Sequence, residues 1–166
     1  MKWNLKWRTI LKMFNTKGLM SSKRKDWKTP RHILDYVEGT YGEFFDPCPS
    51  EESFDGLKIE WKEVNFVNPP YGTEIKKWIE KGYKEWKKGK TIIFLIPSRT
   101  DTRWWHDYVM EADEIYLIKG RLCFDDSKRT APFPSCLAIF DGENSNPNHH
   151  NLKVFPLIFN EEENSA

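Results

Sequence analysis

The chain has 166 residues, of which 39% are hydrophobic, enough for the core of one domain and an argument against a two-domain enzyme. Its three cysteines lack Cys-x-x-Cys spacing, which indicates reduced thiols in a cytoplasmic compartment rather than disulfides, and we expect no structural metal. No apolar stretch approaches the roughly 20 residues that cross a bilayer, so a membrane partner is not expected.

The formal net charge of +1 conceals an asymmetry along the chain. Residues 1–25 contain eight Lys or Arg and no acidic residue, and the rest holds 18 basic against 25 acidic residues, a formal −7. Apolar residues recur in this arm at helical spacing from Trp3 to Phe14. A basic arm indicates a polyanion such as DNA. One alternative is a solvated leader without a role, and another is that translation begins at Met20.

The compact part of the chain is expected to open with a helix. Thr29 is a good N-cap and Pro30 suits the first helical position, so we predict a short helix that ends at Gly39. Residues 44–45 are then typical of a short buried strand that leads into Asp46. A carboxylate at the carboxyl end of a parallel strand lies where open α/β sheets bind ligands.

Two apolar runs, residues 64–67 and 91–97, predict the central strands. Only 21 residues separate Asp46 from Asn68, too few for two further strand–helix units, so the sheet should be small. A helix with its N-cap at Thr73 should pack on the core through residues at helical spacing: Ile75, Trp78, Ile79, Tyr83 and Trp86. Alternating strands and helices indicate an α/β fold.

After the second apolar run, the sequence predicts a polar loop and helix over residues 98–110 and a strand over residues 115–118. Trp104 and Trp105 are adjacent, so at most one of them should face the core. His106 is more typical of a structural helix residue than of a catalytic base. Residues 120–124 and 135–140 are expected to form an antiparallel pair that closes the sheet.

From Asp141 the composition shifts to Asn, Pro and Glu, which indicates a linker and tail. One apolar segment in it, residues 154–159, is expected to dock on the body, and His149-His150 is expected to be a solvated pair rather than a metal site. We therefore divide the chain into three parts: a basic arm at residues 1–25, a folded domain at 26–140 and a tail at 141–166.

The most informative segment is Asn68-Pro69-Pro70-Tyr71, between a predicted strand and a predicted helix. An adenine N6 amine is a poor nucleophile because its lone pair is conjugated into the ring, so an enzyme that alkylates it must hold both N–H groups with acceptors. The Asn68 carboxamide oxygen and the Pro69 carbonyl can supply these acceptors, and consecutive prolines stiffen the turn. Tyr71 offers a ring face for a flipped base. The alternative is a proline turn that only ends a strand.

Five motifs occur in one order: Asp26-Trp27-Lys28-Thr29-Pro30, Asp46-Pro47, the tetrapeptide followed by Gly72, PSRTDTRW at residues 97–104 and APFPS at residues 131–135. With them the chain resembles the phage-type DNA N-6-adenine methyltransferase (Dam) family over about residues 26–140. The tetrapeptide alone also suits enzymes that methylate RNA bases or protein glutamine. The Trp-x-Thr-Pro opening and the arginine-containing segment favour the DNA family.

The resemblance implies S-adenosylmethionine as methyl donor and double-stranded DNA as partner. It also implies a shortened Rossmann-like class I methyltransferase fold, with a mixed sheet and an antiparallel terminal strand. The enzyme would be encoded by a phage or prophage, would act in the cytoplasm of a bacterial host, and would methylate adenine N6 after base flipping.

The resemblance also assigns roles to individual residues. Trp27, Thr29 and Pro30 match the opening motif that contacts the methionine end of the donor. Asp46, followed by Pro47, is expected to accept from the donor's amino group or ribose. The catalytic set is Asn68, Pro69, Pro70 and Tyr71, with Asn68 also against the donor.

Four basic residues flank the predicted active edge and are expected to contact DNA phosphates: Arg99, Arg103, Lys128 and Arg129. The alternative for Arg99 and Arg103 is pairing with Asp101 and Asp107.

Two features depart from the family pattern. The turn after the first strand is Pro47-Cys48-Pro49-Ser50 instead of a glycine-rich turn. The acidic residue that normally binds the ribose has no clear counterpart, and Asp55 is our candidate, with a turn aspartate before glycine as the alternative. These departures motivate a rival from another class, a catalytically weak DNA-binding remnant of the fold.

Overall fold

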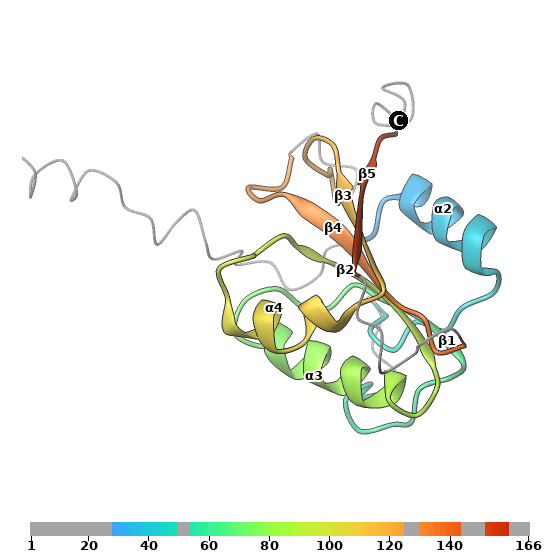
Figure 1. The fold of residues 1–166 in the computed structure, drawn as a ribbon. Coiled ribbons are helices and arrows are strands. Elements are labelled where there is room, and N and C mark those ends of the chain that lie inside the picture. The colour runs from blue at the N-terminus through green and yellow to red at the C-terminus, as the bar shows by residue number, and fades with distance from the viewer. Residues whose placement is uncertain (1–27, 50–53, 125–129, 144–151, 160–166) are drawn as a thin grey trace, which may run out of the picture.

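The computed structural model describes residues 28–49, 54–124, 130–143 and 152–159. They form a five-stranded mixed sheet with helices on both faces, which confirms the predicted α/β class (Figure 1). The elements in chain order are α2 (Arg31–Tyr41), β1 (Val64–Val67), α3 (Ile75–Trp86), β2 (Thr91–Pro97), α4 (Arg103–Asp107), the 3-10 helix η1 (Val109–Glu111), β3 (Glu114–Ile118), β4 (Ser135–Phe140) and β5 (Lys153–Leu157).

The strand order in the sheet is β1-β2-β4-β3-β5. β1 runs parallel to β2 and β3 runs parallel to β5, whereas β4 is antiparallel to both of its neighbours, β2 and β3. Of these five strands, β4 alone therefore runs the other way, and it lies inside the sheet rather than at its edge. The carboxyl ends of the other four strands consequently share one edge of the sheet.

The helices cover the two faces of the sheet. In Figure 1, α3 and α4 lie on one face and α2 lies on the other. α3 approaches β2 closely at Gly82, where an added Cβ would lie 2.3 Å from the Phe94 ring. On the opposite face α2 buries Ile33 and Val37, and the Tyr36 ring lies 6.4 Å from that of Tyr116. Both faces of the central strands are thereby removed from water.

The predicted pairing of residues 120–124 with 135–140 is wrong. All six residues of β4 are buried, and a strand buried on both faces is stabilised best with a neighbour on each side, here β2 and β3. The chain leaves β3 through a turn at Gly120, whose φ is +83°, and residues 121–124 contribute only a single bridge from Cys123 to Thr130. Periodicity identified these segments but not their partners.

Helix ends differ from the predicted ones. Pro30, not Thr29, occupies the N-cap position of α2, and the helix ends before Gly42, whose φ of +78° only glycine adopts readily. Gly39 therefore lies inside the helix. Glu74, not Thr73, precedes α3. The polar loop and helix predicted over residues 98–110 are observed as a loop followed by α4 and η1.

The apolar segment predicted to dock, residues 154–159, does so as the edge strand β5 and the residues after it. Lys153 N–H donates to the Asp113 carbonyl and the Leu157 carbonyl accepts from Lys119 N–H, so these residues direct their backbone polar groups toward β3. The alternation of a strand then turns the Pro156 nitrogen toward the open edge. A proline there costs no ladder hydrogen bond and discourages edge-to-edge pairing.

Candidate active site at the carboxyl edge of the sheet

The sheet brings the predicted site segments to one edge. β1 leads into Asn68 and β2 leads into Ser98, while β4 begins at this edge because it runs the other way. Ser98 N–H donates to the Pro134 carbonyl at 2.9 Å and joins two of the motifs. Residues 44–45, predicted as a strand, form one parallel bridge from Phe45 to Asn65, which brings Asp46 near the same edge.

Asn68 is held on two sides by hydroxyl groups. Its Nδ2 donates to Thr29 Oγ1 at 3.0 Å, and its Oδ1 accepts from the Tyr71 hydroxyl at 2.8 Å. The first contact joins segments 39 residues apart, the start of α2 and the tetrapeptide. The Thr29 hydroxyl thus bonds a side chain across the fold and not the first turn of its own helix. The half-buried Asn68 carboxamide is oriented by both partners.

Tyr71 is part of the core, because only 8% of the residue is exposed. Its ring packs edge-on against Phe124 and Phe133, at centroid distances of 6.0 and 5.1 Å. Burial raises the pKa of Tyr71 well above its ordinary value, so the hydroxyl remains a hydrogen-bond donor to Asn68 at neutral pH. Pro69 is buried beside it and Pro70 is half-buried. The base-stacking role of Tyr71 stays a prediction.

A cavity of about 390 Å³ lies beside the loop after Asp46, a volume typical of small-ligand sites. Its lining residues are Pro47, Cys48, Pro49, Phe54, Asp55, Gly56 and Trp78. Two backbone segments meet here, because a Cβ on Gly56 would lie 1.8 Å from the Pro47 carbonyl oxygen. Because position 56 is glycine, the backbone of this segment can approach the backbone of the Pro47–Pro49 turn closely. Asp55-Gly56 is a recognisable turn signal in the sequence, but nothing local indicates that Gly56 lies against Pro47.

One carboxylate, that of Asp55, lines this cavity, and a second, that of Asp46, directly precedes the lining residue Pro47; their environments differ. Burial raises the pKa of Asp46, although its Oδ1 accepts from Cys48 N–H at 2.8 Å. A desolvated carboxylate of this kind favours a cationic partner. Asp55 instead caps its own turn through Leu57 N–H and pairs with Lys58 at 3.1 Å, which lowers its pKa. Asp55 is therefore a turn aspartate that also lines the cavity.

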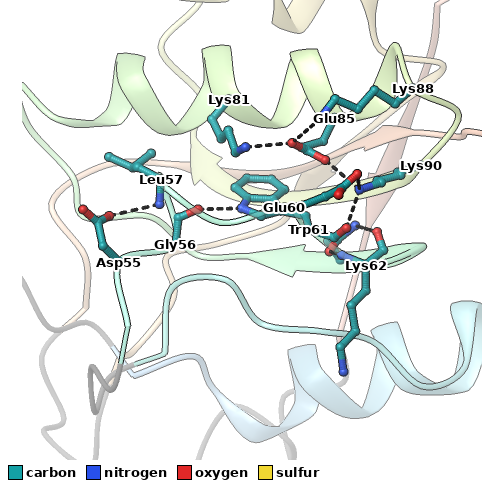
Figure 2. A network of polar contacts seen from close by, with 11 residues as sticks. Asp55, Gly56, Leu57, Glu60, Trp61, Lys62, Lys81, Glu85, Lys88 and Lys90 are labelled. Atoms are coloured by element: carbon teal, nitrogen blue, oxygen red, sulfur yellow. Dashed lines mark hydrogen bonds and ion pairs between the residues drawn. The ribbon is translucent and has the colours of Figure 1, made fainter.

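A polar network supports the segment that carries Gly56 (Figure 2). Trp61 is buried, its Nε1 donates to the Gly56 carbonyl at 2.8 Å, and its own carbonyl accepts from Lys90 Nζ. Lys90 also pairs at 2.8 Å with Glu85 of α3, which is fully buried. Burial raises the pKa of Glu85, but hydrogen bonds from Lys81, Lys90 and Lys88 outweigh it and lower the pKa to about 2. The cavity wall is thus tied to α3.

A second cavity, of about 300 Å³, opens between the end of β2 and the segment before β4. Its lining residues are Pro97, Ser98, Arg99, Asp101, Pro132, Phe133 and Pro134. Phe133 also contacts Tyr71, so this cavity adjoins the tetrapeptide. Arg103 is exposed at the first turn of α4. The sheet therefore brings Arg99 close to the site, as predicted, whereas its contact with DNA stays a prediction.

The tryptophan pair and His106 occupy structural positions. Trp105 is 4% exposed and belongs to the core, whereas Trp104 is partly buried and packs against the margin of the core. His106 Nε2 lies 2.8 Å from the Thr100 carbonyl oxygen on the surface. This contact is consistent with the structural role expected for His106.

Several predicted residues lie outside the described ranges: Trp27, Lys128, Arg129, His149 and His150. Within those ranges, no helix is both long and apolar enough to cross a membrane. The same part of the chain contains no group of three or more His, Cys, Asp or Glu side chains able to hold a metal ion.

Sequence reasoning missed two basic residues at the active edge. β3 ends at Ile118, and exposed Lys119 and Arg121 follow it at the edge that also carries Asn68. The signal was present as Lys-Gly-Arg after a predicted strand, but only the parallel course of β1, β2 and β3 brings it to this edge.

Comparison with known proteins identifies a family that matches this chain. Residues 16–163 match the family profile described as DNA N-6-adenine-methyltransferase (Dam). The chain is 28% identical over 131 residues to a DNA N-6-adenine-methyltransferase of Escherichia phage T1, an overlap of 70% of this chain and 54% of that protein. The chain thus spans about half the length of this curated relative. No solved structure matches this chain.

Proposed function

Because the chain belongs to the DNA N-6-adenine-methyltransferase (Dam) family, we propose that it transfers a methyl group to adenine N6 in double-stranded DNA. The observation that carries the proposal is the doubly held Asn68 carboxamide at the carboxyl end of β1. The phage relative supports an enzyme encoded by a phage or prophage that acts in the cytoplasm of a bacterial host.

The methyl donor in this proposal is S-adenosylmethionine, whose sulfonium supplies an activated methyl group. The residues at the first cavity fit such a molecule. Asp46 would meet the positively charged amino group, because its desolvated carboxylate favours a cation. Pro47, Asp55 and Gly56 would form the wall of its site. Thr29 and Pro30, at the start of α2, would border its methionine end, with Trp27 before them.

Asn68 and Pro69 would act on the target amine. The Asn68 Oδ1 and the Pro69 carbonyl oxygen would each accept a hydrogen bond from one N–H of the N6 amine. These two bonds would turn the nitrogen lone pair out of conjugation and toward the methyl group. Orientation and fixed acceptors supply most of the acceleration, and no covalent bond to the protein is required. The surplus proton can leave to solvent after transfer, so no histidine base is needed.

The adenine must leave the helix to reach Asn68, so the proposal includes base flipping. The cavity beside Phe133 and Arg99 adjoins the tetrapeptide and is a suitable place for the extruded nucleotide. Exposed Lys119, Arg121 and Arg103 would contact flanking phosphates, together with Arg99. Lys128 and Arg129 belong to the same proposal.

The proposal also includes a shortened Rossmann-like class I fold. Support comes from the parallel pair β1 and β2 and from the antiparallel strand β4 beside them, with the motifs gathered at the carboxyl edge. The small sheet agrees with the short separation between Asp46 and Asn68.

Substrate competition tests the proposal. The full chain is incubated with labelled donor and equal amounts of unmethylated DNA, RNA and a glutamine-containing protein. Label in DNA alone is the expected result, and label in RNA or protein would transfer the same chemistry to another substrate. Binding of DNA without binding of donor, measured by titration calorimetry, would instead favour the second candidate, a catalytically weak DNA-binding remnant, which the Pro47-Cys48-Pro49-Ser50 turn in place of a glycine-rich turn supports.

A further inference from the structure

We propose that Thr29 is a positioning residue, which sets the orientation of the Asn68 carboxamide for methyl transfer. The inference rests on the proposed function and deepens it. Thr29 Oγ1 lies 3.0 Å from Asn68 Nδ2, and the residue would act through Asn68 rather than on the target base.

The torsion that orients an asparagine amide is soft, broad and roughly two-fold. The position of the Asn68 oxygen is therefore determined by hydrogen-bond partners and not by the side chain itself. The Tyr71 hydroxyl holds Oδ1 at 2.8 Å and Thr29 holds Nδ2 from the other side. Without the Thr29 hydroxyl, the half-buried Nδ2 would rotate toward another acceptor and carry Oδ1 away from the target amine.

Thr29 is well placed for this task because its backbone is anchored. The next residue, Pro30, has its φ fixed at −57°, and its carbonyl accepts from Ile33 N–H at 3.1 Å as α2 begins. α2 is docked on the sheet through Ile33 and Val37, both fully buried. The anchored start of α2 therefore holds the Thr29 hydroxyl against Asn68, which follows β1. The docking of α2 on the sheet is thereby coupled to the orientation of the Asn68 carboxamide.

The test replaces the hydroxyl and keeps the shape. Thr29→Val should lower kcat about tenfold and leave the dissociation constant of S-adenosylmethionine within about threefold, whereas Thr29→Ser should restore kcat to near wild type. The matched control is Thr40→Val, which removes a threonine hydroxyl from the exposed end of α2, where it bonds the Tyr36 carbonyl. The control should leave kcat unchanged.

Two results would overturn the inference. One is a Thr29→Val enzyme with wild-type kcat. The other is a large rise in the donor dissociation constant with kcat preserved at saturation, because the Thr29 hydroxyl would then act only on the donor that it borders and not through Asn68.

A double-mutant cycle on unfolding separates this inference from the proposed function. Thr29→Val should have almost no further effect on stability in the Asn68→Ala background, and full additivity would mean that the two side chains are not coupled. If the wild-type protein transferred no methyl group, the proposed function would fail, and the positioning role with it. The cycle would still report whether Thr29 holds Asn68.

Discussion

Gly56→Ala tests the wall of the proposed donor cavity. The new Cβ would start 1.8 Å from the Pro47 carbonyl oxygen, and real Cβ contacts do not fall below 3.0 Å, so one backbone segment must retreat by about 1.2 Å. The Trp78 ring would lie 3.0 Å from the same added Cβ, which limits the directions in which the segment can move. We expect a loss of about 1–3 kcal/mol in the free energy of unfolding and at least a tenfold loss in donor affinity.

Urea unfolding and titration calorimetry with S-adenosylmethionine measure the two effects separately. Gly39→Ala is the matched control, because a Cβ there meets nothing within 4 Å and the residue lies inside α2. Alanine in a helix interior should raise stability by about 0.5–1 kcal/mol and leave donor affinity unchanged. A folded Gly56→Ala protein that binds the donor like the wild type would refute the assignment of this cavity.

Three further predictions concern single polar groups. Tyr71→Phe removes the hydrogen bond to Asn68 Oδ1 and keeps the ring packing. It should lower kcat about fivefold, which is equivalent to about 1 kcal/mol. An unchanged kcat would contradict the role of Tyr71 in orienting Asn68. Donor affinity, measured by calorimetry over a pH series, should weaken as the pH falls toward the raised pKa of Asp46, because the protonated carboxyl cannot pair with an ammonium group. The donor affinity of the Asp46→Asn variant should not change with pH in this way. A wild-type affinity that is independent of pH would contradict the contact. Glu85→Gln should cost about 3 kcal/mol at pH 7 in urea unfolding. The lowered pKa, about 2 instead of 4.5, stabilises the fold above pH 4.5, and this contribution is lost as the pH falls through 2. Glu80→Gln, which removes the carboxylate of an exposed pair, should cost far less, and equal losses from the two variants would contradict a special role for the buried network.

The sequence predicted the elements whose patterns are local. Residues 64–67 and 91–97 are strands, and the apolar face of α3 packs on the core as its helical spacing indicates. The tetrapeptide lies at the end of β1, where an α/β sheet presents ligand-binding groups. These predictions needed only periodicity and turn chemistry, which are properties of a few neighbouring residues.

The features that the sequence did not reveal depend on distant partners. β4 enters the sheet between β2 and β3, whereas the sequence predicts an antiparallel pair with residues 120–124. Thr29 gave an N-cap signal, yet its hydroxyl meets Asn68 from 39 residues away. Gly56 gave a turn signal, yet its missing side chain makes room for the backbone at Pro47. The type of a residue limits the interactions that it can make, and the tertiary fold determines which partner it contacts.

The most direct test of adenine methylation identifies the product. Wild-type protein and Asn68→Ala are incubated with S-adenosylmethionine and unmethylated DNA, and the DNA is digested to nucleosides for mass spectrometry. The account predicts N6-methyladenine from the wild type alone, with donor affinity of the variant within about threefold of the wild type. N6-methyladenine from both proteins at equal rates, or from neither although both are folded and bind the donor, would contradict it.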